Sequence, residues 1–433
     1  MRVLVIGSGA REHAIIARLA ADRDVGELVA APGNSGISCL ARTIPVNAGD
    51  VHALIALAER EQIDFTIVGP ELPLSLGLAD RFAAEGRLLF GPTAAASRLE
   101  SSKAFAKAFM ARHGVPTARF RTCGSLDEGL AVLRSGEFGL PVVLKVDGLA
   151  AGKGVVVAED DRTAEAALTS AMGEHKFGAA GDRLVIEECL TGPEVSFFLV
   201  CDGHKAVSIG CAQDHKRVFD DDRGPNTGGM GAFAPSPLLD AALEARVMRE
   251  IVEPVIAGMA AEGHPFRGFL YAGLMLTAAG PKVIEFNVRL GDPEAQVVLP
   301  LIEEPLLPLL AAGATGALRQ STVRLGCNRL TGVVLASRGY PEASESGQLI
   351  TGLDAAEALE GVAVYHAGTA KKDGRIVTAG GRVLTVVGRG ATFAESIARA
   401  YAGVQRISFE GMQYRRDIGQ KALRAGASKD LRI

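Results

Sequence analysis

Short apolar runs alternate with amphipathic stretches over the first hundred residues of the chain. The β-type runs predict strands, and segments such as Val51–Gln62, with apolar residues on one side, predict helices between them. Repeated strand–helix units of this kind indicate a parallel sheet covered on both faces. Ligands of such a sheet gather where its strands end, and the loops there are GSG, APGNSG, GPE and GPT. The four predicted strands are Val3–Ile6, Leu28–Ala31, Phe65–Val68 and Leu88–Phe90.

The pattern changes after residue 103. A helix at Ser102–His113 and another near Leu126–Leu133 are followed by β-type runs, a glycine-rich stretch at 224–231 and a long helix from about Leu239 to Ala260. The last hundred residues form a small α+β pattern that ends in a helix near Thr392–Val404. The predicted strands of the middle part are Val142–Val146, Gly154–Ala158, Leu184–Glu188, Val195–Val200, Ala206–Cys211, Tyr271–Thr277 and Lys282–Phe286, and those of the last part lie within 330–337, 362–369 and 376–388.

Composition places the chain among soluble globular proteins. Its 433 residues suffice for two to four domains, and no apolar run reaches the roughly 18 residues of a membrane-spanning helix. The net charge of −4 gives no basic excess to bind the phosphate backbone of a nucleic acid, so we do not expect a nucleic-acid partner. Without a spanning run, we do not expect a membrane partner either. Six cysteines without a CxxC pair indicate reduced thiols in the cytoplasm, not a zinc site or a disulfide framework. The N-terminal apolar run reads as a first strand, not as a signal peptide.

The first candidate site is the turn GSGAREHA at residues 7–14. A dinucleotide-binding turn needs a third glycine where this chain has Glu12, and a carboxylate there would crowd a pyrophosphate. Gly7, Gly9 and Arg11 still suit a monophosphate or a small polar substrate. A strand-to-helix turn without any ligand explains the same residues.

The second candidate site joins Lys145, at the end of the strand PVVLK, to the loop GLAAGKGVVV at residues 148–157. A glycine loop between two strands can cover a triphosphate with N–H donors, while Lys145 neutralises phosphate oxygens. No hydroxyl residue follows Lys153 and a strand comes next, so this is not the common phosphate-binding loop. An ordinary hairpin with glycines in its turn accounts for the pattern equally well.

The third candidate site is IEFNVRLGDPE at residues 284–294. Glu285, Asn287 and Arg289 alternate along a predicted strand, so their side chains should face one way. One charged and one neutral oxygen ligand suit Mg²⁺, which takes its other ligands from water and phosphate. The guanidinium of Arg289 beside them could hold a transferring phosphoryl group. A solvated polar face would give the same alternation.

At these motifs the chain resembles the phosphoribosylamine–glycine ligase (glycinamide ribonucleotide synthetase) family of the ATP-grasp superfamily, over essentially its whole length. The resemblance implies an N-terminal parallel α/β (Rossmann-like) substrate domain at 1–103, a central ATP-grasp domain at 104–327 with a mobile lid subdomain at about 120–192, and a C-terminal α+β domain at 328–433. The matching segments are VLVIGSGAREHA, APGNSG, TIVGPE, GPT, SKAF, KVDGLAAGKGV, QDHKRV, GPNTGGMGA, GFLYAGLM, RLGDPEAQV, HAGT and GGRVL.

The resemblance also implies where ATP is bound, between two β-rich lobes. Two lysines would meet the α and β phosphates, residues 148–154 would form the lid, the backbone of a hinge would pair with adenine, and Glu194 would take the ribose hydroxyls. These ATP-binding positions are Lys103, Lys145, Gly148, Gly152, Lys153, Gly154, Glu187, Glu188, Cys189, Leu190 and Glu194.

Glu285 and Asn287 match the family's ligands for Mg²⁺ or Mn²⁺. The preceding strand, YAGLML, offers no acidic ligand of the kind found there in many ATP-grasp enzymes. Arg289 and Asp292 are the catalytic candidates. The substrate-binding candidates are Gly9, Arg11, Glu12, Asn34, Asp214, Lys216, Arg217, Asn226 and Gly229. No contact is assigned to HAGT or GGRVL in the C-terminal part.

The implied reaction uses ATP to join glycine to 5-phosphoribosylamine in purine biosynthesis. The glycine carboxylate would attack the γ-phosphate, and the amine would capture the resulting glycyl phosphate, giving glycinamide ribonucleotide, ADP and phosphate. The partners are therefore small molecules, and we expect a cytoplasmic monomer. Three other readings remain open: an NAD-dependent oxidoreductase, which Glu12 disfavours; a carboxylase or formate-using enzyme of the same superfamily; and a nucleotide-binding regulatory module without catalysis.

Overall fold

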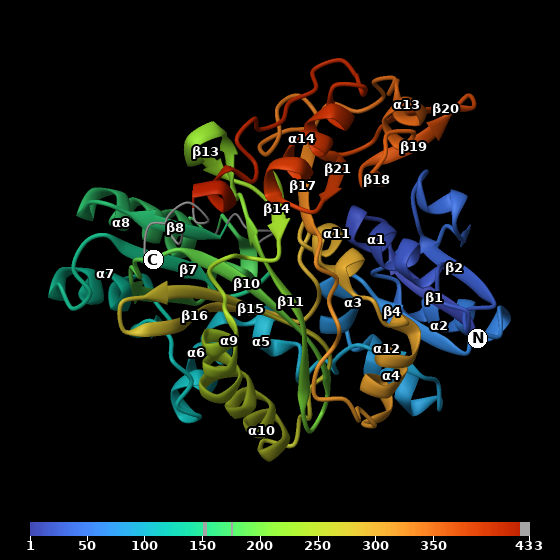
Figure 1. Ribbon diagram of the computed structural model, residues 1–433. Coiled ribbons are helices and arrows are strands. Elements are labelled where there is room, and N and C mark those ends of the chain that lie inside the picture. The colour runs from blue at the N-terminus through green and yellow to red at the C-terminus, as the bar shows by residue number, and fades with distance from the viewer. Residues whose placement is uncertain (150–153, 175, 425–433) are drawn as a thin grey trace.

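The computed structural model describes residues 1–149, 154–174 and 176–424 (Figure 1). Three larger sheets organise these residues: a five-stranded, a four-stranded and an eight-stranded sheet. All six cysteines are free thiols, as the absence of a CxxC pair predicted. Among the helices described, none combines the length and the apolar character needed to cross a membrane.

The N-terminal sheet has the order β3-β2-β1-β4-β5, and every neighbouring pair is parallel. Successive side chains of its central strand β1 enter two different cores, Val3 and Val5 on one face and Leu4 and Ile6 on the other. This explains why the strand is a continuous apolar run, and the predicted parallel α/β unit is confirmed. Its elements are β1 (Arg2–Gly7), α1 (Ala10–Leu19), β2 (Glu27–Pro32), β3 (Arg42–Thr43), α2 (Val51–Arg60), β4 (Phe65–Val68), α3 (Glu71–Ser75), α4 (Leu78–Ala84), β5 (Leu89–Phe90) and α5 (Arg98–Ser101).

The four-stranded sheet is antiparallel, with the order β6-β9-β7-β8. Its strands are β6 (Phe120–Cys123), β7 (Val142–Val146), β8 (Val155–Ala158) and β9 (Leu184–Glu188). The helices α7 (Leu126–Ser135) and α8 (Asp161–Leu168) belong to the same part and share its apolar core. The helix α6 (Lys103–Arg112) precedes this unit.

The eight-stranded sheet runs through the centre of the molecule in the order β16-β15-β10-β11-β14-β17-β21-β18 (Figure 1). Its strands are β10 (Glu194–Asp202), β11 (Ala206–Asp214), β14 (Gly231–Ala234), β15 (Arg267–Thr277), β16 (Gly280–Asn287), β17 (Arg329–Ala336), β18 (Val362–His366) and β21 (Arg382–Gly390). The pairing of β14 with β17, at Ala234 and Leu330 for example, carries the sheet across residue 328. The domain boundaries themselves stay a prediction.

The predicted long helix is divided into α9 (Ala241–Val247), a π-helical turn at Met248–Val252 and α10 (Glu253–Ala261). Two predicted C-terminal runs are also divided. The run predicted at 362–369 is divided into β18, which ends at His366, and the start of β19 (Thr369–Lys372). The run predicted at 376–388 is divided into β20 (Arg375–Thr378) and β21. The remaining elements near the site are the hairpin β12 (Arg217–Phe219) and β13 (Arg223–Asn226), with α11 (Ala295–Val298), α12 (Leu306–Thr315) and α14 (Phe393–Val404).

Candidate active site

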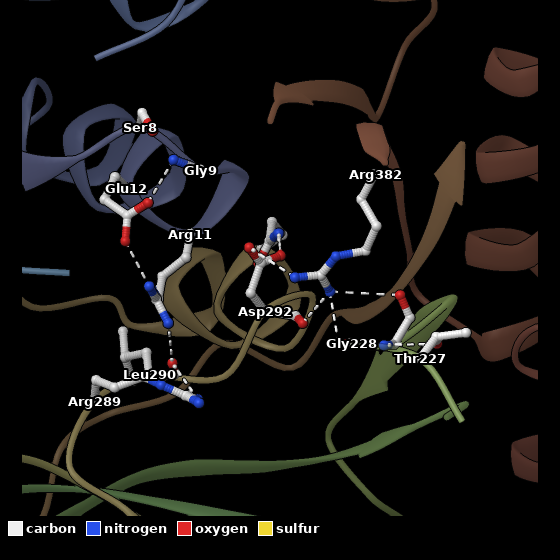
Figure 2. Close-up of polar contacts among 12 residues, drawn as sticks. Ser8, Gly9, Arg11, Glu12, Thr227, Gly228, Arg289, Leu290, Asp292 and Arg382 are labelled. Carbon is white, nitrogen blue, oxygen red and sulfur yellow. Dashed lines mark hydrogen bonds and ion pairs between the residues drawn. The ribbon is translucent and has the colours of Figure 1, made fainter. Parts of the chain in front are cut away.

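The carboxylate of Glu12 fills the space between the glycines of the N-terminal loops. It accepts the N–H of Gly9 at 2.6 Å and lies 2.7 Å from Nε of Arg11 (Figure 2). A Cβ at Gly69 would lie 2.0 Å from Oε1 of Glu12, so this approach requires glycine. The buried carboxylate thus occupies the turn in which a dinucleotide's pyrophosphate would bind, as the sequence indicated. Substrate contacts of Gly9, Arg11 and Glu12 stay a prediction.

The side chain of Asn34 is fully engaged within the protein. Its amide donates to the carbonyls of Ser8 (2.8 Å) and His366 (2.7 Å), and its oxygen accepts the N–H groups of Gly36 (3.0 Å) and Ile37 (2.9 Å). Asn34 therefore links the first loop of the N-terminal sheet to the end of β18. These four contacts favour a structural role for Asn34. A contact of Asn34 with substrate stays a prediction.

Glu285 and Asn287 lie at the end of β16, and the residue that pairs with Glu285 on β15 is Gly273. Burial alone would raise the pKa of Glu285, but Lys216, Lys145 and Lys103 outweigh it and hold that pKa below its usual value. Within the described part of the chain, no ion pair or hydrogen bond engages the Glu285 side chain, and Nδ2 of buried Asn287 has no partner. An ionised carboxylate beside a free amide suits a divalent cation.

Glu285 and Asn287 do not belong to a larger cluster of acidic, histidine or cysteine side chains in the described part of the chain. Across residues 1–149, 154–174 and 176–424, there is no group of three or more His, Cys, Asp or Glu side chains that could hold a metal ion. A cation held by Glu285 and Asn287 would therefore take its other ligands from phosphate oxygens and water, as Mg²⁺ commonly does.

Arg289 does not continue the strand, and the prediction of three alternating side chains on β16 is wrong at this residue. β16 ends at Asn287 because the N–H of Val288 donates to Oε2 of Glu100 (2.7 Å) instead of to a neighbouring strand. The Arg289 guanidinium then lies 3.1 Å from Glu71 and 2.9 Å from Glu100. Glu100 is buried, and its burial raises its pKa.

The two predicted phosphate lysines converge on β16 from different elements. Lys145 of β7 donates to the carbonyl of Ile284 (3.1 Å) and pairs with Glu187. Lys103, at the first turn of α6, donates to the carbonyl of Gly148 (3.0 Å), and burial lowers its pKa. Glu187 also pairs with Lys107, whose pKa burial lowers to about 8. Sequence reasoning missed Lys107, although it follows Lys103 by one helical turn.

The predicted adenine hinge connects the four-stranded sheet to β10. Glu188 ends β9, and Cys189 and Leu190 follow it. Burial would raise the pKa of Glu188, but hydrogen bonds from Arg119 lower it to about 2. Gly154 accepts the N–H of Val146 (2.9 Å). Gly152 and Lys153 lie outside the described residues, as does most of the predicted lid at 148–154.

A second cluster of charged side chains surrounds Lys216, which pairs with Glu194. Burial raises the pKa of Asp214 to about 7, against the opposing charge of Lys216, and Glu294 and Glu194 raise it further. The hydroxyl of Ser196 joins Tyr271 (2.9 Å) to Glu294 (3.3 Å) in the same region. Glu294 was not predicted, although it closes the RLGDPE motif.

The glycine-rich segment after Lys216 folds back as the hairpin of β12 and β13, in which Arg217 is opposite Asn226. Arg217 donates to the carbonyl of Gly224 (2.8 Å). At Gly229, φ is +111° and a Cβ would lie 2.5 Å from Cδ of Pro293, so only glycine fits. The segment that follows the hairpin thus lies against the loop that contains Asp292.

Two side chains hold the Asp292 carboxylate, which also lies close to the backbone of Gly9. Gln296 donates to Oδ1 (2.7 Å), Arg382 lies 3.4 Å from Oδ2, and a Cβ at Gly9 would lie 3.3 Å from Oδ2 (Figure 2). Burial would raise the pKa of Asp292, but Arg382 and Arg11 hold it below its usual value. Sequence reasoning gave no contact to Arg382, Glu71 or Glu100, because their contacts connect distant segments. The motifs TIVGPE and GGRVL, which contain Glu71 and Arg382, were the available signals.

Comparison with known proteins places the whole chain in one family. Family models match in three consecutive parts: the N domain of phosphoribosylglycinamide synthetase at residues 1–100, its ATP-grasp (A) domain at 101–295 and its C domain at 330–421. The chain is 50% identical to a phosphoribosylamine–glycine ligase of Xylella fastidiosa over 98% of both chains, and 47% identical to one of Ralstonia nicotianae over 98% of this chain and 100% of that relative.

Two solved structures of known proteins have a fold similar to that of this chain. A crystal structure of phosphoribosylamine–glycine ligase from Thermotoga maritima has a TM-score of 0.84 at 37% identity, covering 96% of this chain and 100% of that one. A biotin carboxylase from Campylobacter jejuni, at 18% identity and a TM-score of 0.74, shares the fold over 95% of this chain and 92% of its own. The chain therefore belongs to the phosphoribosylglycinamide synthetase family of ATP-grasp ligases.

Proposed function

We propose that this protein uses ATP to join glycine to 5-phosphoribosylamine, releasing glycinamide ribonucleotide, ADP and phosphate in purine biosynthesis. The observation that carries the proposal is the 50% identity to a phosphoribosylamine–glycine ligase over 98% of both chains, combined with an ionised Glu285 among four cationic side chains. Lys103, Lys145, Lys216 and Arg289 are these cations. They suit the negative charge of a nucleoside triphosphate.

The chemistry requires an activated carboxylate, because a free carboxylate is a poor electrophile. A glycine oxygen attacks the γ-phosphorus, the bond to the β–γ bridging oxygen breaks, and ADP leaves. The amine nitrogen of phosphoribosylamine then attacks the acyl carbon of glycyl phosphate, phosphate leaves, and the nitrogen loses a proton. The chain's part is to hold the reactants in line, to neutralise charge and to exclude water.

Lys103 and Lys145 would bind the α and β phosphates, and Arg289 would neutralise the transferred group. The carboxylates of Glu71 and Glu100 fix the guanidinium of Arg289, so it needs little reorganisation during the reaction. Glu285 and Asn287 would hold Mg²⁺ or Mn²⁺, which supplies charge neutralisation at the phosphates when bound. Leu190 and its neighbours would pair with adenine.

The acceptor substrates would bind between Asp292, the 216–229 segment and the N-terminal loops. Carboxylates there, Asp214 and Asp292, can pair with the glycine ammonium or the ribose hydroxyls. Arg11, Lys216 and Arg217 can meet phosphate. This arrangement brings all three parts of the chain to one site.

The decisive experiment is a coupled assay of ADP release by the purified protein, with freshly generated phosphoribosylamine and labelled glycine. We expect ADP and labelled glycinamide ribonucleotide in equal amounts, and no product when bicarbonate or formate replaces glycine. ADP release that depends on bicarbonate or formate, or no product from glycine, would contradict the proposal.

We also propose that the protein is a cytoplasmic monomer built of the domains predicted from its sequence. Its free thiols fit a reducing compartment. Size-exclusion chromatography with light scattering should give the mass of one 45.0 kDa chain. A dimer mass that persists on dilution would contradict the monomer.

A further inference from the structure

Arg382, at the start of β21, is a residue of the C-terminal part of the sheet that reaches the candidate active site. Its Nη1 donates to the carbonyl of Gly228 (2.6 Å) and to the carbonyl of Asp292, and lies 3.5 Å from that of Gly229. Its Nη2 lies 3.4 Å from the Asp292 carboxylate. Figure 2 shows the side chain extending from its strand toward both loops. One guanidinium thus connects three segments far apart in the sequence.

The loop that Arg382 holds packs tightly against the guanidinium at Gly228. A Cβ there would lie 3.0 Å from Cζ of Arg382, so the backbone rests directly on the guanidinium. The N–H of Gly228 is held from the other side by the hydroxyl of Tyr340 (2.9 Å). Two side chains of the C-terminal part therefore fix the backbone of this glycine-rich loop.

The Asp292 carboxylate is oriented by the same contact. Gln296 holds Oδ1, and Arg382 faces Oδ2, the oxygen directed toward Gly9 of the N-terminal loop. Without Arg382, this carboxylate would keep the hydrogen bond from Gln296 of α11 and lose the charge that fixes its second oxygen. The loop carbonyls of Gly228 and Asp292 would lose their shared donor as well.

We propose that Arg382 is a positioning residue that sets the Asp292 carboxylate and the Gly228–Gly229 backbone for the glycine and phosphoribosylamine substrates. The inference rests on the proposed function of Asp292 and of this loop. Arg382 acts through these groups, so it affects the acceptor substrates and leaves ATP binding nearly unchanged. The C-terminal part of the chain thereby completes the part of the site that binds glycine and phosphoribosylamine.

The test compares Arg382→Met and Arg382→Lys with Arg389→Met. Arg389 lies on the same strand, is exposed, and donates to the carbonyl of Pro300, away from the site. We expect Arg382→Met to lower kcat/KM for glycine and phosphoribosylamine at least about tenfold and to change KM for ATP less than about twofold. Arg382→Lys keeps the charge but not the fork, so it should restore only part of the loss. Arg389→Met should behave as wild type.

A double-mutant cycle with Asp292→Asn separates positioning from direct substrate contact. If Arg382 acts through Asp292, Arg382→Met should cost less than about threefold in the Asp292→Asn background. Effects that multiply would overturn the positioning of Asp292 by Arg382, because Arg382 would then act independently of this carboxylate. Equal losses for ATP and the acceptors together with a lower Tm, or unchanged kinetics, would overturn it too.

Amide hydrogen exchange gives a readout without turnover. In the substrate-free protein, Arg382→Met should speed exchange at 227–230 and 289–296, and Arg389→Met should not. Unchanged exchange in both segments would contradict the positioning role. If wild-type protein releases no ADP with glycine and phosphoribosylamine, the proposed function fails, whereas this exchange result still reports on the contacts of Arg382.

Discussion

The carboxylate of Glu285 is surrounded by cations and has no ion-pair partner among the described residues, so its charge is free for a ligand. We expect Glu285→Ala to lower kcat at least about 100-fold with little change in Tm, because the charge that holds the metal is lost and no buried partner is left alone. ADP release and thermal unfolding measure the two effects. Glu250→Ala removes a surface carboxylate that pairs with Arg246, and should change neither. Near-native turnover of Glu285→Ala would contradict the metal site.

The planar guanidinium of Arg289 contacts three groups within the protein. A lysine could reach only one of Glu71 and Glu100 and could not also donate to the carbonyl of Leu290, which lies 3.2 Å from Nη1. We expect Arg289→Lys to lower kcat about 100-fold and to lower Tm, because buried Glu100 is left with an incomplete partner. Kinetics and calorimetry check both, and an unchanged Tm would contradict the role of this ion-pair network.

Asp214 should make stability depend on pH. Burial raises its pKa from 3.8 to about 7, so the folded chain keeps a proton that the unfolded chain releases. The stabilisation is complete below about pH 4 and is lost as the pH rises through about 7. The Tm of Asp214→Asn relative to wild type should therefore increase over this window and level off above it. A difference in Tm that is constant with pH would contradict the raised pKa.

At the scale of elements, β7 and β9 present Lys145 and Glu187 to the end of β16. We expect Lys145→Ala to raise KM for ATP about tenfold with a smaller effect on kcat, because Glu187 keeps Lys107 as its partner. Lys205→Ala, an exposed lysine on the turn before β11, is the control and should leave KM for ATP unchanged. A fall in kcat alone would contradict the assignment of Lys145 to ground-state ATP binding.

The hydrophobic pattern predicted most strands and helices to within a few residues, since alternation and helical periodicity are local properties. It did not predict where β16 ends, because that is decided by Glu100, a residue almost two hundred positions earlier. The same limit applies to the site. Glu285 and Asn287 are predicted as a metal site from their spacing on one strand, whereas the contacts of Lys107, Glu71 and Arg382 form only where separate elements meet.

At the scale of the whole molecule, Asn34 joins the first and last parts of the chain. Asn34→Ala would leave the N–H groups of Gly36 and Ile37 without acceptors, at a cost of about 1–3 kcal/mol for each that stays buried, and would free the carbonyl of His366. We expect a lower Tm and faster amide exchange at 34–40. Asn47→Ala, which removes only a local turn contact to Gly49, is the control. Equal effects of both substitutions would contradict the linking role.

The hydrogen-bonded ladder between β14 and β17 also bears on how this protein can be divided. A gene cut near codon 328 would give two fragments, each with a bare strand edge where the other should pair. Such edges bind each other or aggregate, so we expect the fragments to be recovered in soluble form only when they are produced together. We therefore expect that the parts before and after residue 328 do not fold independently of each other.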